Sequence, residues 1–290
     1  MSEIRFGPAG TGDSFSVRGF KKSAQAIEYV RQFGLTAYEY QCGRGVRLSD
    51  ETAETFLRDA PAADVRLSIH APYFISLSSV DPEKRDNSIG YILESARAAK
   101  RIGADRIVVH TGSATKMSRE EAVALAADTL RRAQQALDEE GLGGVHICPE
   151  TMGKLGQLGT LEEVLTLCKL DERMIPCIDF GHLNARTQGS LKTEADFLRL
   201  YEQVENELGA DRAHCFHVHF SKIEYTSKGE SKHLTFADTV YGPEFEPLCE
   251  VLVKKNAAPT IICESSGTQA EDAQYMAQVY QKMKERNSVK

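Results

Sequence analysis

No stretch of the 290-residue chain approaches the roughly 18 consecutive apolar residues that a membrane-spanning helix requires. The first residues, MSEIRFGPAG, lack the basic-then-apolar layout of a secretory signal. None of the seven cysteines stands in a C-x-x-C pair, and most of them occur singly within apolar runs. These absences argue against a membrane protein and against structural disulfides. We therefore expect a cytoplasmic protein with reduced thiols, and the sequence indicates no obligate protein partner.

An excess of positive charge is also missing, because the net charge is −7. Nucleic-acid-binding proteins are usually basic, so this value does not point to one, but the placement of the positive residues matters more than their sum. Several lysines and arginines fall in predicted loops on one face, whereas the acidic excess lies largely in predicted helices. The loop residues are Arg44, Arg47, Lys116, Lys154, Arg186, Lys222, Lys228 and Lys232. A basic rim on an acidic body is compatible with phosphate binding.

Short apolar runs alternate with longer amphipathic stretches along the whole chain. The predicted strands lie near residues 4, 36 and 214 and end at residues 70, 110, 150, 179 and 264. Amphipathic stretches such as AQAIEYVRQF and EEAVALAADTLRRAQQAL predict the helices between them. Capping-box spacing predicts three helix starts, at Ser118 with Glu121, Thr160 with Glu163, and Thr193 with Asp196.

Eight nearly continuous apolar strands that alternate with helices predict an α/β fold with parallel strands covered by helices. Eight such units within 290 residues favour a (β/α)8 TIM barrel, an eight-stranded parallel barrel, over an open sheet. Because no Gly/Pro-rich linker interrupts the pattern, we expect one TIM-barrel domain over residues 1–290. In this fold the active site lies at the C-terminal ends of the strands.

The polar residues at these strand ends are all histidines or carboxylates. They are His70, His110, Glu150, Asp179 with His182, His217 and Glu264, and His233 follows in the long segment after the seventh strand. Such side chains are the ligands expected of zinc or manganese. A single histidine on a strand is more often a buried core residue than a ligand. Five of the eight histidines on one rim, with three carboxylates, predict a metal site instead.

The remaining histidines are His146, His214 and His219. Because alternate residues of a strand share a face, His217 and His219 of the H-V-H sequence point to the same side of the barrel at different heights. One of the two is therefore expected to support the metal ligands from behind. His146 and His214 lie toward the starts of their strands, and we predict that both are structural.

The strand-end residues stand in a series of short motifs that runs over nearly the whole chain. The motifs are I-H-A-P-Y (69–73), V-V-H-T-G (108–112), P-E-T (149–151), I-D-F-G-H (178–182), H-V-H-F-S-K (217–222) and C-E (263–264). In this order and spacing they resemble endonuclease IV, the family of zinc-dependent abasic-site nucleases, within the wider xylose isomerase-like barrels.

The resemblance implies a cluster of two or three zinc ions, with manganese as the alternative metal. A first ion would be held by His70, His110 and Glu150. Glu150 would bridge to a second ion, which is held also by Asp179, His217 and Glu264. A third ion would be held by His182 and His233.

The resemblance also implies the reaction. It is the hydrolysis of DNA on the 5′ side of an abasic site by hydroxide that the metals activate, as a step of DNA repair. Glu150 and Glu264 would be the catalytic residues, because Glu150 bridges the metals and Glu264 orients the hydroxide. Tyr73 matches a tyrosine that lies beside the abasic nucleotide in the family. Further substrate contacts are expected from the cations Arg44, Arg47, Arg186 and Lys222.

Three departures from the family pattern indicate an outlying branch. Where the family has Asp-x-His, this chain reads Ser231-Lys232-His233, so a third ion would need Glu230, water or a substrate oxygen. The loop after the second strand is shortened to CGRGVRLSD, and His219 stands where the nucleases usually have asparagine.

Two other functions remain open at this point. A sugar isomerase or epimerase on the same barrel uses one divalent metal, and Glu150, Asp179, His217 and Glu264 satisfy that pattern. The surplus of histidines, His70 and His110 among them, counts against this alternative, because a single ion does not need them. A non-catalytic metal-binding barrel is the third hypothesis.

Overall fold

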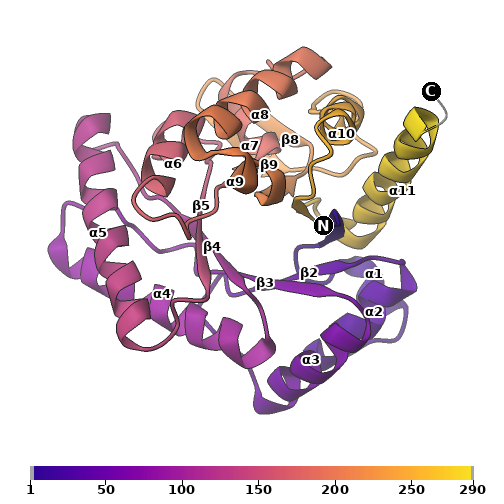
Figure 1. Ribbon diagram of the computed structural model, residues 1–290, viewed down its shortest axis with the longest axis horizontal. Helices are drawn as coiled ribbons and strands as arrows, with labels where there is room; N and C mark the ends of the chain where they lie inside the picture. Colours follow the sequence, from indigo (N-terminus) through magenta and orange to yellow (C-terminus); the bar gives the residue numbers. More distant parts are fainter. Residues whose placement is uncertain (1–2, 289–290) are drawn as a thin grey trace.

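The computed structural model of the protein describes residues 3–288 and contains eight parallel strands that alternate with helices, which confirms the predicted (β/α)8 TIM barrel (Figure 1). The barrel strands are β1 (Arg5–Pro8), β2 (Ala37–Gln41), β3 (Arg66–His70), β4 (Arg106–His110), β5 (His146–Glu150), β6 (Cys177–Asp179), β7 (His217–Phe220) and β10 (Thr260–Cys263).

Helices follow the strands and form the outer layer in Figure 1. They are α1 (Asp13–Val17), the short 3-10 helix η1 (Ser23–Gln25), α2 (Ala26–Gln32), α3 (Asp50–Ala62), α4 (Pro82–Ile102), α5 (Arg119–Glu139), α6 (Leu161–Cys168), α7 (Phe180–Arg186), α8 (Glu194–Leu208), α9 (Ala210–Cys215), α10 (Phe245–Lys254) and α11 (Gln269–Ser288). The predicted capping boxes are present at the starts of α5, α6 and α8. Within residues 3–288, no helix has the length and apolarity needed to cross a membrane.

The barrel closes between its first two strands. The hydrogen-bonded order is β1-β10-β7-β6-β5-β4-β3-β2, and backbone bonds from Thr36 to Phe6 and from Gly10 to Glu39, each 2.9 Å, join the two ends. Gly7 permits this approach, because a Cβ at this position would lie 1.8 Å from the carbonyl oxygen of Ala37. The resulting barrel brings the ends of all eight strands to one rim.

One element was not predicted from the sequence. The long segment after β7 contains an antiparallel hairpin, β8 (Ile223–Thr226) and β9 (Gly229–His233), which ends at His233. The hairpin packs beside α7 (Figure 1), and a bridge between Lys154 and Gly229 joins it to the loop after β5. The rest of the segment is pinned by Phe236, which packs its ring on Phe220. The segment is therefore built into the rim.

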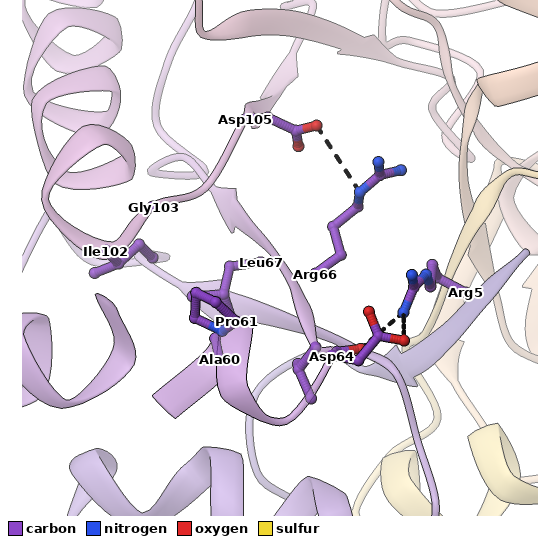
Figure 2. Close-up of a pocket in the computed structure, with 10 residues that line it drawn as sticks. Arg5, Ala60, Pro61, Asp64, Arg66, Leu67, Ile102, Gly103 and Asp105 are labelled. Carbon is purple, nitrogen blue, oxygen red and sulfur yellow. Dashed lines mark hydrogen bonds and ion pairs between the residues drawn. The ribbon is translucent and has the colours of Figure 1, made fainter. Parts of the chain in front are cut away.

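The opposite end of the barrel carries a cavity of about 260 Å³ between Pro61, Leu67 and the starts of β1 and β3 (Figure 2). Figure 2 shows its two guanidinium groups paired with carboxylates: Arg5 lies 2.7 Å from Asp64, and Arg66 lies 3.9 Å from Asp105. Charges that are balanced in this way, at the N-terminal ends of the strands, serve stability in this fold.

The closure of the barrel generates the first prediction. Gly7→Ala should destabilise the protein by about 1–3 kcal/mol or more, since the new methyl group must displace the backbone of β2. Gly90→Ala in α4 is the matched control, because a Cβ there meets no atom within 4 Å. The control should leave stability unchanged or raise it by about 0.5–1 kcal/mol. Urea unfolding of both variants measures the difference, and equal midpoints would contradict the role given to Gly7.

Candidate metal centre

A cavity of about 400 Å³ opens at the C-terminal ends of the barrel strands. The histidines and carboxylates that line it are His70, His110, Glu150, His182, Glu230, His233 and Glu264. Asp179 and His219 are fully buried and lie against Glu150, in the same ligand group. The structure thus brings together every predicted metal ligand except His217, and it adds Glu230 and His219.

Glu150 occupies the centre of the cluster. Its Oε2 atom lies 3.4 Å from Nε2 of His70 and 3.2 Å from Nε2 of His110. Its Oε1 atom faces the other half, 2.9 Å from Nδ1 of His219 and 3.6 Å from Nδ1 of His182. Because Oε2 faces His70 and His110 while Oε1 faces His219, this carboxylate has the geometry of a bridge between two neighbouring cations.

A group of four side chains surrounds the Oε1 side of Glu150. One ligand atom from each of Glu150, Asp179, His219 and Glu264 lies within 4.8 Å of the others. Asp179 ends β6 and caps α7, because its Oδ1 atom accepts a 2.6 Å hydrogen bond from the backbone N–H of His182. Its Oδ2 atom is buried without a hydrogen-bond partner among the described residues. Such an oxygen is costly unless a cation satisfies it.

A third group consists of His182, Glu230 and His233, again with ligand atoms within 4.8 Å of one another. The Nε2 atom of His182 lies 3.4 Å from Oε2 of Glu230. Ser231 is exposed instead, and its hydroxyl is directed toward Glu224 at 3.5 Å. The hairpin therefore supplies Glu230 to the two histidines, one residue before the position where the endonuclease IV pattern has aspartate.

Hydrogen bonds fix which ring nitrogen of two histidines faces the cluster. Nδ1 of His70 lies 2.8 Å from the carbonyl oxygen of Ala71, and Nδ1 of His182 lies 2.9 Å from that of Thr151. A carbonyl oxygen can only accept, so Nδ1 carries a proton in each ring, and Nε2 is the nitrogen whose lone pair is available to a metal ion when the ring is neutral. Ser221 contacts Nδ1 of His233 at 2.9 Å. Such hydrogen bonds are typical of histidines that bind metals.

The pKa values of the cluster residues reflect an excess of buried negative charge. Burial alone would lower the pKa of His70, but Glu150 raises it to about 9. Burial likewise opposes protonation of His182, and Asp179 and Glu230 raise its pKa to about 9. Burial raises the pKa of Glu264, and the charges of Glu150 and Asp179 add to this effect. Carboxylates packed this closely need compensating positive charge, which divalent metal ions supply.

The structure places His219 beside the proposed ligands and His217 behind them, whereas the sequence-based assignment had His217 as a ligand. β7 continues to Phe220, and His219 pairs with Asp179 of β6, whereas His217 pairs with Cys177 one layer deeper. His217 contacts Oε2 of Glu39 at 2.9 Å, and burial lowers the pKa of His217 to about 4, so the ring is neutral. The sequence-based assignment chose His217 as the ligand, and the pairing of His219 with Asp179 at the end of β6 is the signal that places His219 nearer the rim.

The predicted substrate residues fall into two groups. Tyr73 lines the cavity with 58% of its surface exposed, and Arg44 and Arg47 are exposed on the short loop after β2, outside the cavity wall. Arg186 instead donates to the backbone carbonyls of the loop after β5, at 2.8 Å to that of Lys154. Lys222 is buried and bonds at 2.7 Å to Glu244. Both of these cations hold loops in position.

Lys154 was noted in the sequence as a rim cation but was not selected as a site residue. It lines the metal-site cavity, and its side chain is exposed. Its backbone is fixed, because its carbonyl accepts from Arg186 and its segment pairs with Gly229. The predicted structural role of His146 agrees with its 2.7 Å hydrogen bond to the carbonyl of Arg173.

Comparison with known proteins identifies relatives over most of the chain. An uncharacterized protein of Methanocaldococcus jannaschii, MJ0133, is 32% identical over 87% of this chain and 91% of its own length. A protein named probable endonuclease 4 from Thermoplasma acidophilum is 27% identical over 80% of each chain. These identities confirm the resemblance to endonuclease IV and are those of an outlying branch.

Solved structures with the same fold include two different kinds of enzyme. Endonuclease IV from Thermus thermophilus aligns with a TM-score of 0.67 at 21% identity, over 97% of this chain and 99% of its own. A D-tagatose 3-epimerase-like protein aligns with a TM-score of 0.73 at 18% identity, over 98% and 100%. Residues 27–285 match the family model described as xylose isomerase-like TIM barrel, and the chain therefore belongs to this family.

Proposed function

We propose that this protein is a metal-dependent phosphodiesterase of the endonuclease IV type, which hydrolyses DNA on the 5′ side of abasic sites and acts in DNA repair. The observation that carries the proposal is the position of Glu150 between two sets of histidines, with a third ligand group beside it. Relatives named endonuclease 4 support the same reaction class.

The donor set fits zinc. His70, His110 and Glu150 would hold one ion, and Glu150, Asp179, His219 and Glu264 would hold a second. A third would be held by His182, Glu230 and His233, so that Glu230 supplies the carboxylate that Ser231 cannot. Nitrogen and carboxylate ligands in groups of three or four are typical of catalytic zinc sites, and manganese is the alternative ion.

Bound zinc would polarise the phosphoryl oxygens and lower the pKa of water toward 7. The protein contributes position and proton transfer. Glu264 lines the cavity and has a raised pKa, so its carboxylate can accept a proton from an attacking water molecule. Glu150 is deeper, with a pKa that His219 and the other histidines hold well below the usual range despite its burial, and it remains a carboxylate that joins the two halves of the cluster.

Substrate contacts come from the rim. Lys154 places a positive charge at the cavity, which suits a phosphate group. Tyr73 and its neighbour Phe74 are exposed aromatic side chains, with 58% and 42% of their surfaces accessible, and they suit contact with a deoxyribose or a base. Arg44 and Arg47 on the adjacent loop would contact the backbone of the same strand.

A mononuclear sugar isomerase or epimerase is the second candidate, supported by the four-residue group of Glu150, Asp179, His219 and Glu264. Those residues suffice to hold one divalent ion that polarises a carbonyl group. A single ion held by those four residues does not need His70 and His110 as ligands. A non-catalytic metal-binding barrel would need none of the rim contacts.

The ligand assignment is tested by two histidine variants. His219→Ala should bind one zinc ion fewer per chain, because it removes a ligand that faces both Glu150 and Glu264. His217→Ala should keep the full zinc content and lose about 1–3 kcal/mol of stability, because Glu39 loses a buried hydrogen-bond partner. Elemental analysis after dialysis gives the zinc content, and the reverse pattern would restore His217 as the ligand.

The reaction is tested with a DNA duplex that carries one stable abasic analogue. Zinc-replete protein should produce a single nick on the 5′ side of the analogue and leave a 3′ hydroxyl. His110→Ala should reduce the rate by on the order of 100-fold or more, because even residues that only support metal ligands contribute about 10–100-fold. Gel electrophoresis of both strands identifies the position of the nick.

The two candidate enzymes differ in this experiment. Folded protein with its full complement of metal that leaves the duplex intact would rule out the abasic-site reaction. Conversion of a ketose by the same preparation, retained in His110→Ala, would then support the mononuclear isomerase.

Lys154 provides a further prediction. Lys154→Met should raise KM for the abasic duplex with little change in kcat, and it should reduce the slope of log affinity against log salt by about 1. Lys100→Met, in the last turn of α4 at the far end of the barrel, is the control and should change neither quantity. Equal behaviour of the two variants would remove Lys154 from the substrate contacts.

A further inference from the structure

A carboxylate that belongs to none of the proposed metal-ligand groups lies directly behind the cluster. Glu39 is in the middle of β2, and its side chain is fully buried inside the barrel. Glutamate is almost never fully buried without partners, because removing its charge from water is costly. The packing of a TIM-barrel interior needs only branched apolar side chains at such a position. The presence of Glu39 therefore points to a specific task.

Four side chains converge on the two oxygens of Glu39. Oε2 accepts hydrogen bonds of 2.9 Å from the hydroxyl of Ser68 and from Nε2 of His217. Oε1 accepts a 3.1 Å hydrogen bond from Gln41 and lies 3.1 Å from Nε2 of His219. Three of these partners come from the strands β3 and β7, so the carboxylate is held from several sides.

His219 connects this carboxylate to the proposed metal centre. Its Nε2 atom faces Glu39, and its Nδ1 atom lies 2.9 Å from Glu150 and 3.5 Å from Glu264. A neutral imidazole has one N–H and one lone pair. The ring is hydrogen-bonded through Nδ1 to Glu150 at 2.9 Å, whereas Nε2 meets Glu39 at 3.1 Å without hydrogen-bond geometry. A cation bound at Nδ1 would take the place of the Nδ1 proton, and the ring proton would then be on Nε2, facing Glu39.

We propose that Glu39 is a positioning residue of the metal centre, which fixes the tautomer and the orientation of His219 so that Nδ1 binds the metal shared with Glu150, Asp179 and Glu264. The proposal rests on the metal centre of the proposed function, but not on the substrate. His217 and Ser68 act one step further back, because they hold Glu39 in place.

This arrangement explains why β7 carries two histidines on one face. His217 and His219 both contact Glu39, with their rings 5.3 Å apart, yet only His219 reaches the cluster. His217 is thereby a neutral hydrogen-bond donor to the carboxylate that orients its neighbour. Carboxylates that contact the second nitrogen of a metal-binding histidine usually raise metal affinity.

Glu39→Gln is the test variant, because it keeps the shape of the side chain and removes the charge. The affinity of the site that contains His219 should fall about 10–100-fold, measured by competition with a chromophoric zinc chelator. The number of zinc ions bound at saturation should stay the same. With cobalt in place of zinc, the visible absorption bands of this site should shift, since the donor strength of His219 changes.

Ser68→Ala is the companion variant, since it keeps the carboxylate and removes one of its hydrogen bonds. It should lower zinc affinity in the same direction by a smaller factor, and it keeps the test decisive if Glu39→Gln does not fold. Glu224→Gln, on β8 of the hairpin, is the control and should leave zinc affinity unchanged. Urea unfolding of the metal-free variants measures any separate effect on stability.

The possible outcomes distinguish a positioning role of Glu39 from a structural role and from direct metal binding. Unchanged zinc affinity in Glu39→Gln, with stability alone reduced, would overturn the proposal and make Glu39 a structural residue. Loss of one ion at saturating zinc would overturn it too, because Glu39 would then be a ligand. A wild-type protein that binds no metal would overturn both this proposal and the metal centre. Zinc binding that depends on Glu39, without nicking of abasic DNA, would leave the proposal intact and refute the nuclease alone.

Discussion

The close packing of carboxylates at one end of the barrel is the constraint on which the rest of the site depends. Glu150, Asp179, Glu264 and Glu39 lie within a few side chains of one another, and three of the four are almost completely buried. Without positive charge their mutual repulsion and desolvation would destabilise the fold. The surrounding histidines supply part of this positive charge. The Oδ2 atom of Asp179 lies 3.3 Å from Nδ1 of His182 but has no hydrogen-bond partner among the described residues. Divalent ions held between these side chains would supply the missing positive charge.

The loops around the cluster are held by hydrogen bonds and ion pairs to other charged side chains. Arg186 reaches from α7 to the carbonyl oxygens of the loop after β5, and Lys222 ties the segment after the hairpin to Glu244. The hairpin itself is joined to Lys154 through Gly229, and this junction places Glu230 against His182. Two cations that the sequence suggested as substrate contacts therefore build the cavity walls. The exposed side chains at the cavity, such as Lys154 and Tyr73, are not tied down in this way.

The sequence was sufficient for the barrel and for most of the rim. His70, His110, Glu150 and Asp179 each end a predicted strand, and parallel strands bring their C-terminal ends together at one rim. The sequence was not sufficient where the register between neighbouring strands determines which residue lies at the rim. The alternation within H-V-H puts both histidines on one face, and only the pairing of His219 with Asp179 shows which one reaches the rim. It also gave no indication of the hairpin, whose short strands carry mostly polar residues, so Glu230 was considered only as a substitute. Glu39 was missed because a single glutamate in a strand has no periodic pattern.

The number of ions decides which substrate the cavity attracts. Five carboxylates lie in the cluster or directly behind it, from Glu39, Glu150, Asp179, Glu230 and Glu264, and histidines that are neutral when they bind metal add no charge. One divalent ion leaves this set strongly negative and two leave it one charge negative, which suits a neutral sugar better than a phosphate. Three ions make it positive by one charge, and Lys154 adds another at the cavity wall. The group of His182, Glu230 and His233 would therefore matter for the choice of substrate, because an ion held there would change the sign of the net charge at the cavity.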